Sequence, residues 1–276
     1  MDDARLDFAA AWQAYTDRRH RARRTDEEDR ALWASFAARY DDVAVPCEEL
    51  LDLLKSLVRP GDALLDVGAG TGLYSLPLAP LVARVTALDH TPAMLRRLQH
   101  KAQERGIVNI HPVEAALEDA TIAPHDVVLA AWSLYRQRDI VASLRKLVDA
   151  ARRTLVIVDG DSGLHRDGER PHEAVRAEIW GGGPGIPNYL YFAGILWQIG
   201  VRAEVRVLYH DRVCAGATPG EVAAQVTPAD ATPEQAERFA QGLLPLIQHE
   251  NGHYAYRYTL PVGVVIWNRR GPADGR

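Results

Sequence analysis

"LLDVGAGTGLYSL", residues 64–76, places three glycines at alternate positions directly after an apolar run. A tight turn needs only one glycine, whereas three so close together let the backbone approach a ligand. The spacing G-x-G-x-G at Gly68, Gly70 and Gly72 differs from the dinucleotide pattern G-x-G-x-x-G, and no Lys-Ser/Thr pair follows as in a Walker-type phosphate loop. Asp66 would repel a pyrophosphate but suits a ligand with positive charge. The stretch is therefore predicted to bind a cationic nucleoside.

Around this stretch, short apolar runs alternate with helical segments. Five runs are too short for helices, are rich in β-branched residues and lack polar alternation, which is typical of buried strands: 63–67, 83–89, 107–113, 126–132 and 154–160. The clearest helix between them has Thr91 as N-cap, Pro92 at its first position and Gly106 as its stop. Because parallel strands need such crossovers, the pattern predicts an open α/β sheet with ligands bound beyond the carboxyl ends of its strands.

The first 60 residues are predicted to form an N-terminal helical cap. An apolar stripe at spacing i, i+4, i+7 indicates a first helix (Phe8, Trp12 and Tyr15). Thr25 and Glu28 form a capping box at the start of a second helix, whose buried face would carry Trp33, Phe36, Ala37 and Tyr40. A third helix has Pro46 in its first turn and ends before Pro60.

The composition is typical of a globular protein. The chain has 276 residues, of which 47% are hydrophobic, and it lacks both an apolar run of about 18 residues and a signal-peptide pattern, so we expect a cytoplasmic protein without a membrane segment. Two distant cysteines, Cys47 and Cys214, support neither a disulfide framework nor a zinc site. The net charge of -5 gives no general attraction for nucleic acid, and the basic residues 17–24 precede the acidic "TDEEDR", which favours a solvated helix face.

The sequence carries a family resemblance over roughly residues 62–160. "LLDVGAGTG", "VTALD" and "HDVVLAAWSL" occur in the order of the class I S-adenosylmethionine-dependent methyltransferases and resemble their motifs. The resemblance implies S-adenosylmethionine as cofactor and a Rossmann-like, mostly parallel seven-stranded sheet with helices on both faces and an antiparallel last strand. The remaining strands would be 202–210 and 254–268, with a bulge or break at Pro261.

The resemblance also assigns residues to parts of the cofactor. The glycine loop would line the methionine and ribose (Gly68, Ala69, Gly70 and Gly72), and Asp66 would support it through water or the ammonium group. Asp89 would accept hydrogen bonds from the two ribose hydroxyls, since a fixed carboxylate makes strong charge-assisted bonds. His90 would flank the adenine. The adenine amino group would meet Leu117 and Glu118, with Glu114 as the competing position.

Two aromatic residues have alternative roles. Trp132, just after the fourth strand, would lie near the reactive methyl group or pack in the core. Tyr40 resembles a tyrosine that closes over the methionine carboxylate, and its position on a helix face is equally suited to core packing.

Residues 61–276 are predicted to form the methyltransferase domain, with two insertions that exceed what the sheet needs. Residues 161–186 and 215–252, together with the N-terminal helices, would form the acceptor pocket and its lid. The stretch 181–185, "GGGPG", would be a hinge or a turn. Nearby aromatic residues suggest a largely apolar acceptor site (Trp180, Tyr189, Tyr191 and Trp197).

Methyl transfer explains why no catalytic triad is visible, because alignment of the reactants alone can supply roughly 7–11 kcal/mol. A general base would be needed for some acceptors, and the candidates are His210, Tyr135 and His253. The stretch "HENGH", which begins at His249, matches the zinc-protease pattern, but its Asn-Gly pair favours a helix end that enters the last strand, and no metal site is expected.

These observations predict a methyltransferase that acts on a small-molecule acceptor. An RNA or protein methyltransferase is the alternative within enzymes, although the sequence lacks a wide basic patch for RNA. A non-catalytic S-adenosylmethionine-binding protein would carry the same loop and carboxylates. The glycine spacing disfavours a nicotinamide-dependent oxidoreductase.

Overall fold

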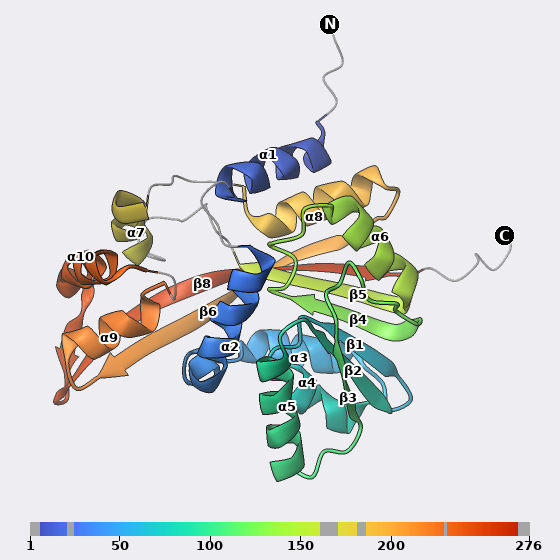
Figure 1. Ribbon diagram of the computed structural model, residues 1–276, viewed down its shortest axis with the longest axis horizontal. Helices are drawn as coiled ribbons and strands as arrows, with labels where there is room; N and C mark the ends of the chain where they lie inside the picture. The colour runs from blue at the N-terminus through green and yellow to red at the C-terminus, as the bar shows by residue number, and fades with distance from the viewer. Residues whose placement is uncertain (1–5, 21–24, 161–170, 181–185, 229–230, 270–276) are drawn as a thin grey trace, which may run out of the picture. The chain divides into compact units, whose positions relative to one another are not determined.

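The computed structural model describes residues 6–20, 25–160, 171–180, 186–228 and 231–269. At its centre is a sheet with the strand order β3-β2-β1-β4-β5-β8-β6, in which a further short strand, β7, pairs with β8 (Figure 1). The strands are β1 Ala63–Val67, β2 Arg84–Asp89, β3 Ile110–Glu114, β4 His125–Ala131, β5 Ala151–Gly160, β6 Glu204–Gly216, β7 Gln248–Glu250 and β8 His253–Asn268. The predicted open α/β sheet is confirmed, with the short β7 as an addition to the seven strands expected.

The parallel half of the sheet sets the position of the glycine stretch. β1 pairs in parallel with β2 and β4, so Asp66 lies between Ala87 and Leu129. β3 extends the sheet beyond β2, and β5 extends it beyond β4, both also in parallel. All five residues of β1 are buried, as the continuous apolar run predicted. The loops that follow β1, β2 and β4 therefore emerge at one edge of the sheet.

Several strands differ from the sequence prediction. β5 begins at Ala151 rather than at residue 154, and β6 runs from Glu204 to Gly216 rather than over 202–210. The third strand begins at Ile110 rather than Ile107, because Val108 is exposed and the side-chain amide of Asn109 donates hydrogen bonds to the carbonyl groups of Ala79 and Val82. The last strand runs without a break through Pro261, where a bulge or break was expected.

The helices in the first half of the chain are α1 Phe8–His20, α2 Asp26–Val43, α3 Glu48–Leu57, α4 Ser75–Leu78, η1 Ala79–Leu81, α5 Pro92–Glu104 and α6 Ile140–Ala150. The predicted capping box at Thr25 is confirmed, since its hydroxyl accepts from the Glu28 amide and the Glu28 carboxylate accepts from the Thr25 amide. Thr91 precedes α5 as predicted but makes no side-chain cap bond, and Pro46 lies just before α3 rather than in its first turn.

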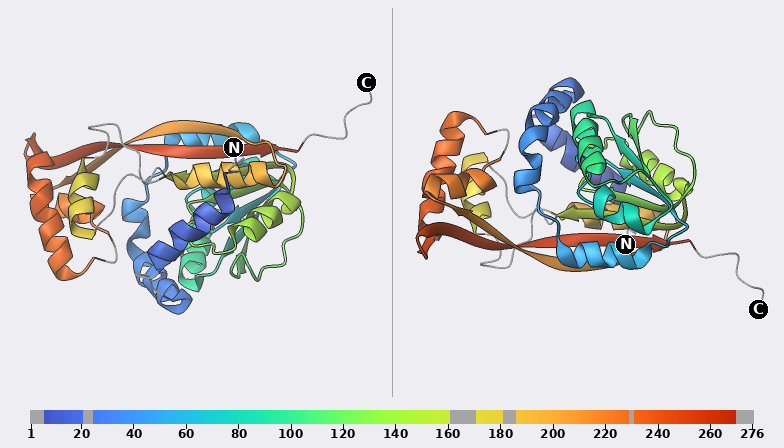
Figure 2. Two further views of the ribbon diagram at one scale, coloured as in Figure 1. Left: turned by 90° about the horizontal axis from the view of Figure 1, so that it is seen from above. Right: turned by 90° about the horizontal axis from the view of Figure 1, so that it is seen from below.

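One face of the sheet is covered by α1, α6 and α8 Asn188–Gln198, which contact one another (Figure 2). Trp12 of α1 is fully buried, and its ring lies 5.1 Å from that of Phe192 in α8. Its Nε1 donates to the carbonyl oxygen of Gln137 at 2.8 Å. The N-terminal helix therefore fixes the segment that follows β4, which matters for the site described below.

The described residues divide into two compact units. The first comprises the described residues within 1–159, 188–208 and 263–276, and the second comprises those within 160–187 and 209–262. The second unit contains α7 His172–Trp180, α9 Pro219–Val226, α10 Pro233–Leu243 and η2 Leu244–Leu246. Its helices α7 and α10 pack through the rings of Trp180 and Phe239, which are 5.4 Å apart. Both predicted insertions lie largely in this unit, and their lid role stays a prediction.

The stretch "HENGH" is a β-hairpin, so the predicted helix end is wrong. Asn251 and Gly252 both have positive φ, 48° and 82°, and join β7 to β8 in the two-residue turn that Asn-Gly favours. His249 lies opposite Tyr254, and Glu250 lies opposite His253. The two histidines therefore lack the shared helix face on which the zinc-protease pattern depends.

The four aromatic residues expected around one acceptor site are dispersed. Tyr189 and Tyr191 are buried in the core under α8, and the exposed Trp197 stacks under the guanidinium group of Arg202. Trp180 packs in the second unit. The stretch 181–185 lies outside the described residues.

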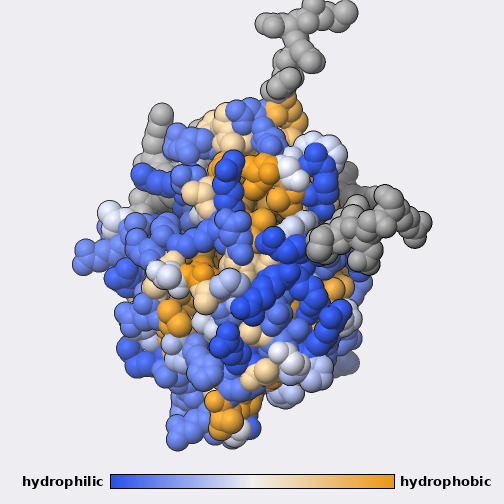
Figure 3. All heavy atoms as spheres, turned by 90° about the vertical axis from the view of Figure 1, so that its right-hand side faces the viewer, coloured by the Kyte–Doolittle hydropathy of each residue, from blue (hydrophilic) through white to orange (hydrophobic). Residues whose placement is uncertain are grey.

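None of the helices in the described part of the chain has the length and apolar character needed to cross a membrane. On the face shown in Figure 3, hydrophilic residues surround small groups of hydrophobic ones.

Candidate active site

A cavity of about 420 Å³ opens at the carboxyl ends of β1, β2 and β4. It is lined by Val67 and Ala131, the last residues of β1 and β4, and by Leu88, the residue before the end of β2; α2 and the loop after β3 contribute walls. The cavity collects many of the predicted site residues from separate segments: Tyr40, Gly68, Gly70, Asp89, His90, Leu117, Glu118, Trp132 and Tyr135.

The backbone conformation of the loop explains all three of its glycines, since Gly72 also has a positive φ, 87°. Gly68 and Gly70 have φ angles of 72° and 55°, a region that side chains disfavour. The amide of Gly68 donates to the carbonyl oxygen of Leu88 at 2.7 Å, which ties the loop to β2. A Cβ on Gly68 would lie 2.3 Å from the Cβ of Ser133, whereas one on Gly70 would have no atom within 4 Å. Gly68 therefore permits close packing, and Gly70 leaves space beside the cavity.

Asp89 is the fixed carboxylate of the site. One oxygen accepts from the amide of Gly70 and the other from the amide of Thr91, both at 2.8 Å. A carboxylate has about four lone-pair positions, so each oxygen retains capacity for a further donor. The side chain thus holds the glycine loop and can still bind a pair of hydroxyl groups.

Helix α2 covers the cavity with an aromatic face. Trp33, Phe36 and Tyr40 are half-buried and contact one another edge to face with ring centroids about 6 Å apart, and Trp33 and Tyr40 line the cavity. Burial raises the pKa of Tyr40 to about 12, with Tyr135 and Asp89 as further causes. Tyr40 therefore stays protonated at neutral pH and can act as a hydrogen-bond donor.

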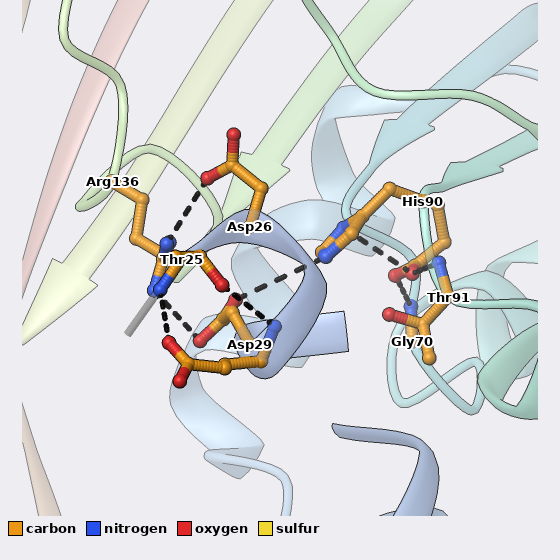
Figure 4. A network of polar contacts seen from close by, with 9 residues as sticks. Thr25, Asp26, Asp29, Gly70, His90, Thr91 and Arg136 are labelled. Atoms are coloured by element: carbon orange, nitrogen blue, oxygen red, sulfur yellow. Dashed lines mark hydrogen bonds and ion pairs between the residues drawn. The ribbon is translucent and has the colours of Figure 1, made fainter. Parts of the chain in front are cut away.

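Ion pairs connect the first turn of α2 to the loop after β4, as Figure 4 shows. The Arg136 guanidinium contacts the Asp29 carboxylate at 2.8 Å and that of Asp26 at 3.2 Å. His90 lies on the other side of Asp29, with 3.9 Å between Nε2 and a carboxylate oxygen, and its Nδ1 is 3.9 Å from Asp89. A series of polar contacts thus runs from the loop after β4, through α2, to the carboxylate at the end of β2.

Trp132 has a strained backbone at the end of β4. Its φ is 50°, in the left-handed region that non-glycine residues seldom adopt, and its amide donates to the carbonyl oxygen of Val158 at 2.8 Å. The indole stacks on Tyr74, with centroids 6.1 Å apart and an interplanar angle of 15°, and it also lines the cavity. Strain of this kind is concentrated at functional sites, which supports a role for Trp132 there.

A family model described as a methyltransferase domain matches residues 64–155, the range that contains the glycine loop, Asp89 and most of the cavity walls. Over these residues the chain contains a methyltransferase domain. The sequence motifs in this domain imply S-adenosylmethionine as its cofactor.

Other proteins resemble parts of this chain. A protein of Mycobacterium tuberculosis is 41% identical over 80 residues, which are 28% of this chain and 29% of that protein. The 23S rRNA (uracil(1939)-C(5))-methyltransferase RlmD of Chromohalobacter salexigens is 33% identical over 115 residues, 41% of this chain and 24% of that enzyme. The chain thus spans less than a third of the length of either relative. The crystal structure of the YcgJ protein of Bacillus subtilis shares the fold, with a TM-score of 0.55, 14% identity and coverage of 82% of this chain and all of that one.

The residues around the methyltransferase cavity fit the cofactor. Asp89 retains acceptor capacity that suits the two ribose hydroxyls, and the open space beside Gly70 admits a ligand next to the loop. Met94 and Leu117 offer apolar contact for a base. The carboxylates at the cavity also suit a ligand with positive charge on sulfur and nitrogen.

The residues predicted to contact the adenine differ in whether they line the cavity. Leu117 and Glu118 line the cavity, and their carbonyl groups both accept from the Lys146 ammonium, at 2.7 and 2.8 Å. Glu114 lies at the end of β3 opposite Asp89 and does not line the cavity. The structure thus places the favoured pair, rather than the competitor, next to the cavity.

Three residues expected at the cofactor lie beside the cavity rather than in its walls. Asp66 accepts from the Ser75 hydroxyl at 2.6 Å, and burial raises its pKa to about 6. Ala69 is buried against β2 and α5, and a Cβ on Gly72 would press on the side chains of Leu76 and Leu98. Their positions favour a role in holding the loop.

The three candidates for a general base also differ in whether they line the cavity. Tyr135 lines the cavity from the loop after β4 and lies near Tyr40. His210 and His253 belong to the second unit and are absent from the cavity walls. Of the three, Tyr135 is therefore the candidate that the cavity brings together with the other site residues.

Sequence reasoning placed Tyr40 and the N-terminal helices at the site, but it missed the first turn of α2 and Trp33. It assigned Trp33 to a buried helix face and the acidic residues before it to a solvated face, yet Asp26, Asp29 and Trp33 line the cavity. Arg136 was also missed. A signal was present, since the four carboxylates in the first turn of α2 attract a cation and Arg136 follows closely after the strand-four motif.

Proposed function

We propose that this protein transfers a methyl group from S-adenosylmethionine to a small-molecule acceptor by in-line displacement at the sulfonium. The main support is the arrangement of Asp89 and Gly70, in which a carboxylate bonded to the glycine loop keeps acceptor capacity next to a cavity. A cavity of about 420 Å³ is within the range of small-molecule sites.

An RNA acceptor is the second candidate because one relative is an rRNA methyltransferase. The charges around the cavity argue against it. The walls carry five carboxylates and two guanidinium groups (Asp26, Asp29, Asp89, Glu118 and Asp119 against Arg30 and Arg136). Proteins that bind RNA need positive charge near the phosphates, so this surplus of carboxylates favours a neutral or cationic acceptor.

When bound, S-adenosylmethionine supplies a methyl group that is already activated as a sulfonium. The chain would then act mainly by holding its ligands in place. We propose that Asp89 binds the ribose, His90 and Leu117 contact the adenine, and Gly68 and Gly70 line the methionine. Tyr40 would donate to the carboxylate, and Trp132 would form the wall at the reactive methyl. A proton on the acceptor would pass to a base, for which Tyr135 is the proposed residue.

Calorimetric titration with S-adenosylmethionine, S-adenosylhomocysteine and NADH tests the cofactor part of the proposal. Micromolar binding of the two sulfur nucleosides without NADH is expected. Binding of NADH alone would refute the proposal, because it would show that the glycine spacing was misread.

Release of S-adenosylhomocysteine tests the acceptor part. The purified protein is incubated with the cofactor and either a panel of small amines, phenols and carboxylic acids or total RNA. Turnover with a small molecule supports the proposal, and turnover with RNA alone would contradict it. Cofactor binding without any turnover would favour the non-catalytic alternative. The cytoplasmic location expected from the sequence belongs to this proposal as well.

A further inference from the structure

Helix α2 is attached at both of its ends by ion pairs. At its C-terminal end, the Asp41 carboxylate contacts Arg97 and Lys101 of α5, each at 2.7 Å. The Thr71 hydroxyl of the glycine loop donates to the same carboxylate at 2.6 Å. Burial acts to raise the pKa of Asp41, but these hydrogen bonds outweigh it and lower the pKa below the ordinary value. This end is fixed to two segments of the domain.

At its N-terminal end, α2 is attached through Arg136. The side chain of Arg136 is 15% exposed, and it faces Asp29, which is 3% exposed, and Asp26, which is 98% exposed. An ion pair with an exposed carboxylate contributes little, whereas removing one partner of a buried pair is costly because the other charge is left buried without compensation. The contact between Arg136 and Asp29 is therefore the important one at this end.

The part of α2 between these two attachments covers the cavity. Trp33 and Tyr40 line it from this helix, so a movement of the helix would uncover the cavity. The capping box of Thr25 and Glu28 consists of two hydrogen bonds inside the first turn, so α2 can move as an intact helix. If the guanidinium is removed, the buried Asp29 loses the cation that faces it, and water becomes the better environment for its charge.

We propose that Arg136 is a positioning residue that holds the N-terminal end of α2 over the cofactor and thereby slows cofactor release. It acts through α2, whose aromatic residues cover the cavity. The proposal rests on the proposed function, since it takes S-adenosylmethionine as the ligand. It adds a residue outside the glycine loop and Asp89 that controls how long the ligand stays bound.

The first measurement uses the unliganded protein and follows amide hydrogen exchange in α2, β1 and β4. Arg136→Met should speed exchange in residues 26–36 at least tenfold and leave β1 and β4 unchanged. Arg136→Lys should give an intermediate rate, because it keeps the charge but not the two-pronged geometry of the guanidinium. Asp29→Asn removes the charge from the other side and should act in the same direction. The control is Arg145→Met, which replaces an exposed arginine on α6 and should have no effect.

The second measurement is the dissociation rate of S-adenosylhomocysteine by stopped flow. We expect about a tenfold increase in Arg136→Met with little change in the association rate, which corresponds to ~1.4 kcal/mol of affinity. Unchanged exchange and dissociation in both Arg136→Met and Asp29→Asn would overturn the proposal. Faster exchange throughout β1, β4 and α2 would also overturn it, since that indicates general destabilisation. If the unmodified protein does not bind S-adenosylhomocysteine, the proposed function fails, and the exchange measurement still tests the role of Arg136.

Discussion

Adding one methyl group at Gly68 should destabilise the protein much more than adding one at Gly70, two positions further along the same loop. Both residues have positive φ, 72° and 55°, so alanine costs about 1–2 kcal/mol at either site through backbone strain alone. The two positions differ in their surroundings. The new Cβ at Gly68 would lie 2.3 Å from the Cβ of Ser133, whereas at Gly70 no atom lies within 4 Å.

The steric overlap of the new Cβ with Ser133 determines how much more Gly68→Ala lowers the free energy of unfolding than Gly70→Ala. Overpacking in a well-packed region costs roughly 1–3 kcal/mol. Gly68→Ala should therefore lower the free energy of unfolding by about 2–5 kcal/mol, and Gly70→Ala by about 1–2 kcal/mol. Ligand binding should respond differently, because the methyl group at Gly70 adds bulk next to the loop where the cofactor is proposed to bind.

Urea unfolding of both variants, alone and combined with Ser133→Gly, measures these effects. Ser133→Gly should recover part of the loss in Gly68→Ala and none of the loss in Gly70→Ala. Calorimetry with S-adenosylhomocysteine should show the larger loss of affinity, relative to the loss of stability, for Gly70→Ala. Equal stability losses for the two variants, or no recovery by Ser133→Gly, would refute the packing argument.

Three further changes test other parts of the site. Asp89→Ala should weaken S-adenosylhomocysteine binding at least tenfold, as measured by calorimetry. Because Asp89 also accepts hydrogen bonds from two loop amides, Asp89→Asn serves to separate the effect of the charge from the support of the loop. Unchanged affinity in both variants would contradict the proposed ribose contact. Burial raises the pKa of Asp66 from 3.8 to about 6, so the stability that its protonated form contributes is present below pH 3.8 and is lost as the pH rises through 6. Asp66→Asn should remove this pH dependence and raise the free energy of unfolding at pH 8, measured in urea, by up to ~3 kcal/mol. A pH profile of stability that is the same in Asp66→Asn as in the unmodified protein would contradict this expectation. Replacing His249 and His253 together by alanine should leave zinc content by mass spectrometry unchanged, and loss of stoichiometric zinc would show that the hairpin binds metal.

Much of the fold was predictable because buried parallel strands are recognisable from their own residues. The runs at 63–67 and 126–132 are continuous and apolar, and they became β1 and β4 with at most one residue of difference. The run from Ile107 failed at its start because β-branched residues also occur in loops, and Val108 faces solvent. Asn251-Gly252 can end a helix or turn a hairpin, and only the pairing of β7 with β8 decides between them.

The site was predictable where it depends on local sequence. Gly68, Gly70 and Asp89 occupy strand ends that a parallel sheet brings to one edge. Contacts between distant segments were not predictable, because they depend on how α2 crosses the sheet edge. The pairing of Asp29 with Arg136 is of this kind.

The order of the strands along the chain has a consequence for synthesis. β8 is the last strand described, yet it lies between β5 and β6, which are both made before it. Until the ribosome has released the segment that ends at Asn268, β5 has an unpaired edge and β6 has no neighbour in the sheet. Such edges invite pairing with other chains, and non-local strand pairing is slow. The nascent chain therefore passes through a period in which aggregation competes with folding, and this period ends when β8 enters the sheet.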